Sequence, residues 1–337
     1  MKIAFFSSSP LSVSLADTLK KHFEIALVGT NPDRPIGRKA ILTPSVLKNW
    51  ALKNQIDVFT PHTLKNEVGT EIAQKIHENK IDLAIVIDYG LLIPSVVFNA
   101  PRHQTINIHF SLLPKYRGAY PDAFVILSGN KKTGISFVLI DEGYDTGDLI
   151  AQKEVKILPE ETASQLHQRL YQETTQILPY IITHWVNDLS RNNSEQKLEQ
   201  NLSYQYYSPP RKQDHSLANY TKRLERDDGF ILWETLQKIL KNEEVSWEQL
   251  PKLIQENVLP TDYLHFAFCI FNFYRSLTPW PGVWTKVKTE KGEKRLKILK
   301  AKLENEKLIL VEVQLEGKKT VRWKDFLRNF SYLNGSS

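Results

Sequence analysis

Two polar residues, Asn107 and His109, lie at the end of the strand-like run 105–108. Side chains alternate along a strand, so residues two apart point to the same face. A carboxamide and an imidazole side by side could hold the negative oxygen that forms when a carbonyl carbon is attacked. Taken alone, such a pair is more often two hydrogen-bonded surface residues, so both interpretations stay open.

A second polar segment, residues 141–148, reads Asp-Glu-Gly-Tyr-Asp-Thr-Gly-Asp. Two glycines among acidic residues indicate a tight loop and not a regular element. Such a loop could be a hairpin turn with solvated carboxylates or a loop that binds a cation. The acids lack the alternating spacing and the terminal glutamate of an EF-hand, so the pattern does not support a calcium site.

The elements that position these segments follow the pattern of a sheet covered by helices. Short apolar runs alternate with stretches of helical spacing, which predicts a Rossmann-like, doubly wound α/β sheet. Ligands of such sheets bind at the carboxyl ends of the strands, where the winding reverses. Strands are predicted at 3–6, 25–28, 58–59, 83–87, 105–108, 134–140 and 148–157, and helices at 11–22, 44–54, 68–79, 120–127 and from about 162.

The last third of the chain has a different pattern. Residues 187–215 are polar and contain the pair Pro209-Pro210, which predicts an exposed linker. Residues 283–323 show short alternating strands broken by charged turns, which is typical of a small antiparallel barrel. We therefore predict three ranges: a catalytic domain at 1–186, a linker at 187–215, and a C-terminal barrel domain at 216–337 with a helical insertion near 237–262.

Composition limits the class of protein. The chain has 337 residues, 41% of them hydrophobic and 24% charged, which is typical of a globular protein with two domains. The single cysteine, Cys269, excludes an internal disulfide framework and a cysteine-based zinc site, so a reducing, cytoplasmic location is expected. No apolar run approaches the roughly 20 residues that cross a bilayer, so no membrane partner is expected.

Positive charge is concentrated toward the C-terminal end. From residue 210 onward there are 23 Lys or Arg against 17 Asp or Glu, whereas the preceding residues are balanced. Between Lys286 and Lys302, eight basic residues face two acidic ones. This asymmetry favours a polyanionic partner, although a solvated basic face would show it too.

Together the two polar segments resemble the folate-dependent formyltransferases. Residues 107–114 read Asn-Ile-His-Phe-Ser-Leu-Leu-Pro, and the acidic, glycine-containing loop follows at the family's position. The resemblance implies an enzyme that transfers a formyl group from 10-formyltetrahydrofolate to an amine, with Asn107, His109 and Asp145 as the catalytic trio. It requires no metal. The folate-binding residues that it implies are Ser111, Leu112, Leu113, Pro114, Tyr89, Gly90, Leu91, Leu92 and Ile140.

Two further segments bear on the amine. Residues 31–38 resemble the loop that enters the tRNA acceptor arm in family members acting on methionyl-tRNA, which implies Arg34 and Arg38 as acceptor contacts. Residues 220–224 and 275–282 resemble the C-terminal, oligonucleotide-binding (OB-like) domain of the same members. The resemblance therefore implies initiator methionyl-tRNA as the partner, a role in translation initiation, and a monomer.

Two rivals remain at this stage. A nucleotide-linked amino-sugar N-formyltransferase would share the trio, and a non-catalytic folate- or RNA-binding protein would share the fold. Phe110, where the family has a small residue, and the segment 39–41 depart from the usual pattern. Neither departure touches the trio, so both bear on the acceptor and not on the reaction.

Overall fold

The computed structural model describes residues 1–37, 39–190, 207–259, 265–290 and 292–330. The chain forms two compact units. Unit 1 contains residues 1–117, 134–155 and 168–220, and unit 2 contains residues 118–133, 156–167 and 221–337. Among the described residues, no helix combines the length and the apolar character needed to cross a membrane.

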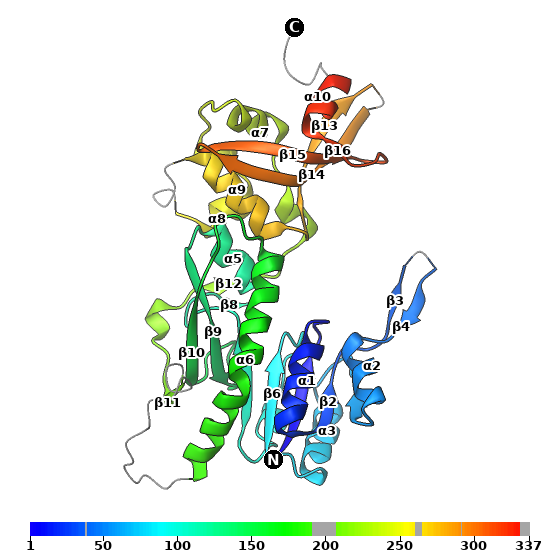
Figure 1. The fold of residues 1–337 in the computed structure, drawn as a ribbon, viewed down its shortest axis with the longest axis vertical. Coiled ribbons are helices and arrows are strands. Elements are labelled where there is room, and N and C mark those ends of the chain that lie inside the picture. Colours follow the sequence, from blue (N-terminus) through cyan, green and yellow to red (C-terminus); the bar gives the residue numbers. More distant parts are fainter. Residues whose placement is uncertain (38, 191–206, 260–264, 291, 331–337) are drawn as a thin grey trace. The chain divides into compact units, whose positions relative to one another are not determined.

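The centre of unit 1 is an eight-stranded sheet with the order β11-β10-β9-β7-β6-β1-β2-β5 (Figure 1). Strands β5, β2, β1, β6 and β7 pair in parallel, and β9 joins β7 in the antiparallel direction. The winding reverses beside β1, because β2 lies on one side of it and β6 on the other. The strands are β1 (Lys2–Ser7), β2 (Glu24–Gly29), β5 (Asp57–Phe59), β6 (Leu83–Ile87), β7 (Thr105–His109), β9 (Lys132–Leu139), β10 (Leu149–Lys156) and β11 (Tyr207–Arg211).

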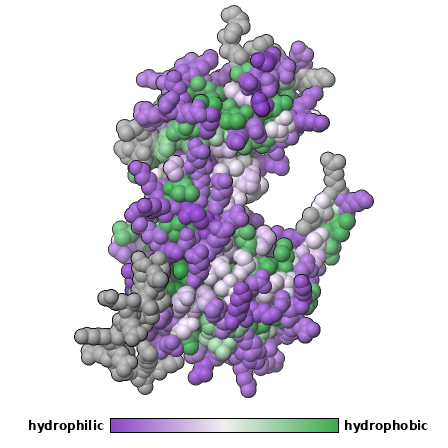
Figure 2. Space-filling model, viewed as in Figure 1, coloured by the Kyte–Doolittle hydropathy of each residue, from purple (hydrophilic) through white to green (hydrophobic). Residues whose placement is uncertain are grey.

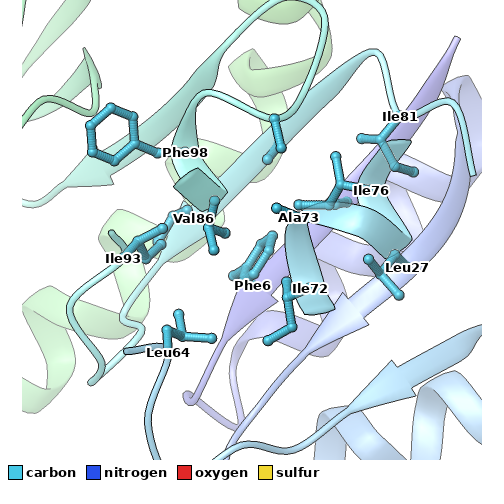
Figure 3. Close-up of a cluster of buried hydrophobic side chains, with 14 residues drawn as sticks. Phe6, Leu27, Leu64, Ile72, Ala73, Ile76, Ile81, Val86, Ile93 and Phe98 are labelled. Carbon is cyan, nitrogen blue, oxygen red and sulfur yellow. The ribbon is translucent and has the colours of Figure 1, made fainter. Parts of the chain in front are cut away.

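Helices of unit 1 pack their apolar stripes on this sheet. In α3 the buried residues Gly69, Ile72, Ala73 and Ile76 recur at helical spacing. Figure 3 shows Ile72 and Ala73 beside Phe6 of β1. The helices are α1 (Ser12–His22), α2 (Val46–Lys53), α3 (Glu67–Glu78), α4 (Ser95–Phe98) and α6 (Ala163–Ser190), of which α6 begins in unit 2.

A hairpin of β3 (Arg34–Ile36) and β4 (Ile41–Thr43) extends from unit 1 (Figure 1). Its first strand lies within the segment 31–38, which resembles the loop that enters the acceptor arm. Ile41 and Leu42 are 62% and 64% exposed, and Figure 2 shows hydrophobic atoms on the hairpin. Arg38 lies outside the described residues, so its predicted contact stays a prediction.

Unit 2 contains a four-stranded antiparallel sheet in the order β13-β14-β15-β16. In β13 the side chains of Val283, Thr285 and Val287 are buried, whereas Lys286 and Lys288 between and after them are exposed. The strands are β13 (Val283–Thr289), β14 (Gly292–Glu304), β15 (Lys307–Leu315) and β16 (Val321–Arg322), and the helices are α5 (Pro121–Leu127), α7 (Trp233–Leu240), α8 (Lys252–Asn257), α9 (Phe266–Leu277) and α10 (Trp323–Asn329).

Short elements complete the fold. Strands β8 (Arg117–Gly118) and β12 (Tyr220–Thr221) form a separate two-stranded sheet. Single 3-10 turns occur at η2 (His215–Leu217), η3 (Arg226–Gly229) and η4 (Trp247–Gln249). The predicted fold class, a Rossmann-like sheet followed by a small antiparallel C-terminal β-structure, is confirmed.

The predicted domain ranges 1–186, 187–215 and 216–337 do not coincide with the two compact units. Within the predicted linker, β11 adds to the central sheet, and residues up to Tyr220 belong to unit 1. Strand β11 tolerates Pro209 and Pro210 because it is an edge strand and its pairing with β10 is irregular, with a register shift between Leu149 and Ala151. As a division into independently folding domains, the predicted ranges stay a prediction.

Candidate active site

Strand β7 places Asn107 and His109 at the carboxyl edge of the sheet. The strand lies between β6 and β9. Ile106 and Ile108 are 0% and 3% exposed and point into the core. Asn107 is half-buried and His109 is buried, and both lie on the opposite face of the strand because side chains alternate. The sequence argument for one shared face therefore holds.

The side chain of Asp145 joins this pair from the loop after β9. Asn107 Nδ2 donates to Asp145 Oδ1 over 3.0 Å. His109 Nδ1 lies 3.5 Å from the other carboxylate oxygen, Asp145 Oδ2. The carboxamide, the imidazole and the carboxylate thus meet at one point, from residues up to 38 positions apart in the sequence.

The second ring nitrogen of His109 has a backbone partner. Nε2 lies 2.8 Å from the carbonyl oxygen of Tyr116. A carbonyl oxygen only accepts hydrogen bonds, so Nε2 carries the hydrogen of this bond. Both ring nitrogens therefore face acceptors, and the ring donates to both only when both nitrogens are protonated. The Tyr116 carbonyl was not foreseen, because a backbone group leaves no mark in the residue pattern.

The loop that carries Asp145 is a tight turn stabilised by side-chain hydrogen bonds. Asp141 Oδ1 accepts from the Gly143 N–H over 3.0 Å and from Thr146 Oγ1 over 2.6 Å. Asp145 has a φ of +54°, a left-handed conformation that is uncommon for a residue other than glycine. A Cβ at Gly147 would lie 1.9 Å from the carbonyl oxygen of Leu139, so only glycine fits there. Asp141 therefore folds the loop.

No metal cluster occurs in the described part of the chain. Among those residues, no three or more His, Cys, Asp or Glu side chains are grouped so that they could hold an ion. The contacts of Asp141 favour the tight-turn interpretation of this loop over the cation-binding one.

The segment after β7 forms a tightly held turn. Ser136 Oγ donates to the Ser111 carbonyl over 2.6 Å and accepts from the Leu113 N–H over 3.1 Å. Gln152 Nε2 donates to the Leu113 carbonyl over 2.9 Å. Ser111 and Leu113 are thus buried residues that shape the turn, and the remaining predicted folate contacts of this segment, Leu112 and Pro114, are half-buried.

The other predicted folate residues gather beside the core of unit 1. Tyr89, Leu91 and Ile140 are partly buried and pack against the cluster shown in Figure 3. Leu92 is 52% exposed, and a Cβ at Gly90 would have no atom within 4 Å. These residues therefore combine apolar side chains with open space.

Two tyrosines in this region have buried hydroxyl groups. The Tyr89 hydroxyl has no hydrogen-bond partner in the described part of the chain, and burial raises its pKa well above the usual range. Tyr171 Oη donates to Asp88 Oδ2 over 2.8 Å, and burial, followed by the Asp88 charge, raises the pKa of Tyr171.

Phe110, the unusual neighbour of His109, contacts Tyr171. The two rings pack edge to face with their centroids 5.2 Å apart, and Phe110 is 3% exposed. The large side chain is thus accommodated inside unit 1. Tyr171 lies in a long helix whose sequence gives no local sign of this contact.

Of the two predicted acceptor residues, the structure describes only Arg34. Its side chain is exposed in β3. Beside it, Asp33 pairs with Lys48 of α2 over 2.8 Å, which fixes the base of the hairpin.

Comparison with known proteins gives the family of the chain. Residues 1–182 match the family described as formyl transferase, and residues 262–308 match the formyl transferase C-terminal domain. The first match covers more than half of the chain. The chain belongs to the formyl transferase family. A curated relative, the methionyl-tRNA formyltransferase of Alkaliphilus oremlandii, is 33% identical over 97% of this chain and 96% of its own.

Solved structures show the same fold for this formyltransferase. The methionyl-tRNA formyltransferase from Clostridium thermocellum matches with a TM-score of 0.54 and 16% identity over 94% of this chain and 98% of its own. The sugar 3N-formyl transferase WlaRD, solved with dTDP and 5-N-formyl-THF, matches with a TM-score of 0.57 and 19% identity over 95% and 99%. At these identities, both matches bear on the fold alone.

The prediction of a one-carbon formyltransferase is therefore confirmed at the level of the family. Formyl transfer is the family's reaction, and the relatives named methionyl-tRNA formyltransferase cover nearly the full chain at about 30% identity. The roles of individual residues are not tested by these comparisons.

Proposed function

We propose that this formyltransferase moves the formyl group of 10-formyltetrahydrofolate to the α-amino group of initiator methionyl-tRNA. The observation that carries the proposal is the convergence of Asn107, His109 and Asp145 at the carboxyl edge of the sheet. The curated relatives supply the acceptor, because they are named methionyl-tRNA formyltransferases.

The reaction needs donors more than it needs a nucleophile from the protein. The amine nitrogen forms a bond to the formyl carbon, and the carbonyl oxygen becomes negatively charged. The bond from that carbon to N10 of the folate then breaks, and the proton lost by the amine is taken up by N10. Donors placed at the developing charge lower the barrier, typically by about 3 kcal/mol for each donor.

Asn107 supplies one of these donors. Its amide carries two N–H hydrogens, one of which is given to Asp145. This bond fixes the rotation of the amide and directs the second N–H away from the carboxylate. Because the donor is oriented before the charge appears, no reorganisation is needed during the reaction.

His109 supplies a second donor by exchanging partners. Its Nε2–H is given to the neutral carbonyl of Tyr116 in this structure. An oxyanion is a stronger acceptor, since charge-assisted hydrogen bonds are roughly twice as strong as neutral ones. The exchange is therefore favoured as charge develops on the formyl oxygen, which makes it an interaction that strengthens in the transition state.

Asp145 holds both donors and is a base in direct contact with them. Its two carboxylate oxygens face Asn107 and His109. In the proposed mechanism it also accepts the proton of the attacking amine, directly or through a water, and passes it toward N10.

The predicted folate residues fit a flat, partly apolar co-substrate. Tyr89, Leu91 and Ile140 offer half-buried apolar side chains, and the space beside Gly90 is open. Apolar walls with a few polar groups are typical of cofactor sites. The backbone of Ser111–Pro114 is held by Ser136 and Gln152, which would keep such a wall rigid.

A basic face of unit 2 supports a polyanionic acceptor. The register of β13 and β14 pairs Lys286 with Arg295 and Trp284 with Lys297, so these side chains share one face. Lys288 extends the face by two residues, and Arg295 lies over the Trp284 ring at 4.1 Å. Glu293 opposite Lys288 is the acid on this face and pairs with Lys286 over 2.9 Å, which leaves the face with an excess of positive charge. Basic residues gathered on one sheet face are typical of a phosphate-binding surface.

We further propose that the protein is a cytoplasmic monomer.

Formyl transfer to defined amines tests the proposal. The purified protein is incubated with 10-formyltetrahydrofolate and either methionylated initiator tRNA or a nucleotide-linked amino sugar. Formylation of methionyl-tRNA, with no transfer to the sugar, is expected. Transfer to the sugar alone would end the tRNA assignment, and no transfer to either would end the proposed reaction.

A further inference from the structure

Gln213 binds the backbone of the loop that carries Asp145. Its Nε2 donates to the carbonyl oxygens of Asp145 and Gly147, each over 2.8 Å. The residue is 5% exposed, and it follows β11 in the segment that sequence reasoning placed in the linker. Both N–H hydrogens of this amide are thus donated to the loop that carries Asp145, one to the residue before Thr146 and one to the residue after it.

Arg117 fixes the other end of the same amide. Its guanidinium nitrogen Nη2 donates to Gln213 Oε1 over 2.7 Å. Nη1 donates to Tyr220 Oη over 3.1 Å and lies 3.2 Å from His215 Nδ1. A guanidinium only donates and a carbonyl only accepts, so this environment permits one orientation of the Gln213 amide.

Burial makes these contacts consequential. Arg117 is 1% exposed, and a buried guanidinium is costly unless its N–H groups have acceptors. Removing Gln213 Oε1 would take away a close acceptor, and removing Nε2 would leave two loop carbonyls without this donor. Each buried polar group left unsatisfied costs roughly 1–3 kcal/mol.

The segment that contains Gln213 is also linked to His109, through Tyr116. Tyr116 precedes Arg117 directly, and its carbonyl accepts from His109 Nε2. The backbone N–H of Tyr116 donates to Asn219 Oδ1 over 2.6 Å. Residues 213–220 therefore hold both the partner of His109 and the loop of Asp145.

We propose that Gln213 is a positioning residue for formyl transfer, which acts through Asp145. The loop needs such support because Asp145 has a left-handed backbone, a conformation that persists only where its surroundings impose it. Gln213 touches none of the reacting atoms. The inference rests on the proposed function, because it assigns Asp145 a role in the transfer.

Gln213→Leu tests the inference, because it keeps the size of the side chain and removes its polar groups. We expect kcat to fall about 10- to 100-fold, since a displacement near 1 Å costs up to this much. KM for the folate should stay within about threefold. Gln172→Leu is the matched control, because Gln172 is exposed on α6, and it should leave kcat unchanged.

A double-mutant cycle separates positioning from general destabilisation. If Gln213 acts through Asp145, Gln213→Leu should cause no further loss of kcat in an Asp145→Ala background. An equal loss in both backgrounds, or a folded Gln213→Leu enzyme with unchanged kcat, would overturn the inference. If Gln213→Leu does not fold, Gln213→Glu replaces it in the same cycle, because this variant keeps the acceptor for Arg117. If neither variant folds, the role of Gln213 is structural and the inference is overturned.

The wild-type enzyme keeps the two proposals apart. Absence of formyl transfer by the wild type refutes the proposed function. Transfer by the wild type together with an unaffected Gln213→Leu variant refutes only the positioning role.

Discussion

Gly147→Ala is a sharp test of the catalytic loop, because the residue touches no substrate and yet fixes the position of Asp145. The new Cβ would lie 1.9 Å from the Leu139 carbonyl oxygen, whereas Cβ atoms essentially never approach below 3.0 Å. Leu139 belongs to the central sheet and pairs with Ile106 of β7. The sheet is held on both sides, so the loop must retreat by at least 1.1 Å, the difference between these distances.

A retreat of this size should mainly lower turnover. Asp145 lies two residues from Gly147, and its 3.0 Å bond to Asn107 would be lengthened beyond hydrogen-bonding range. Misplacement by about 1 Å can cost about 100-fold in rate, or roughly 2.7 kcal/mol in the barrier. We therefore expect kcat to fall about 100-fold, measured as formyl transfer at saturating co-substrates and at 20 °C.

Gly229→Ala is the matched control. Its Cβ would also lie 1.9 Å from a backbone oxygen, that of Gly282 in unit 2. The clash should lower the free energy of unfolding of both variants, whereas only Gly147→Ala should lose kcat once the fraction folded is known from circular dichroism. A folded Gly147→Ala enzyme with kcat within threefold of the wild type would refute the reasoning.

Two further predictions concern unit 2. Burial raises the pKa of the Cys269 thiol from 9.0 to about 12, so its stabilising contribution is complete below pH 9 and is lost as the pH rises toward 12. When the pH is raised from 8 to 10, the unfolding free energy of the wild type, measured by urea titration, should therefore fall by about 1 kcal/mol more than that of Cys269→Ala. Equal decreases in the two proteins would contradict this. Lys288→Ala and Lys297→Ala should each weaken tRNA binding and reduce the slope of log K against log salt by about 1, whereas an unchanged slope would remove these side chains from the tRNA interface.

Local patterns were enough to predict the parallel core and the shared face of Asn107 and His109. The apolar run Leu83–Ile87 became β6 with the same bounds, because a strand buried on both faces has to be apolar throughout. Asn107 and His109 were placed on one face by strand alternation alone. The catalytic roles of all three residues were assigned only through the family resemblance, and the meeting of Asp145 with the pair has no sign in the acidic loop itself.

Long-range polar contacts were beyond the reach of the sequence. Gln213 contacts Asp145 across 68 positions and Arg117 across 96, with no periodicity to reveal either contact. The prolines of β11 led to the prediction of a linker, because the sequence of a proline-containing edge strand resembles that of an irregular connection. The residues that support the site were therefore missed, whereas the three residues proposed to carry the chemistry do lie together.

The most direct test of the catalytic trio is the turnover of His109→Ala. The affinity for the folate should stay within a few fold of the wild-type value, because His109 is not among the predicted folate-binding residues. Turnover should fall by about 100-fold or more, since the variant loses a donor at the oxyanion and the imidazole beside Asp145. A folded His109→Ala enzyme that transfers the formyl group at the wild-type rate would contradict the account.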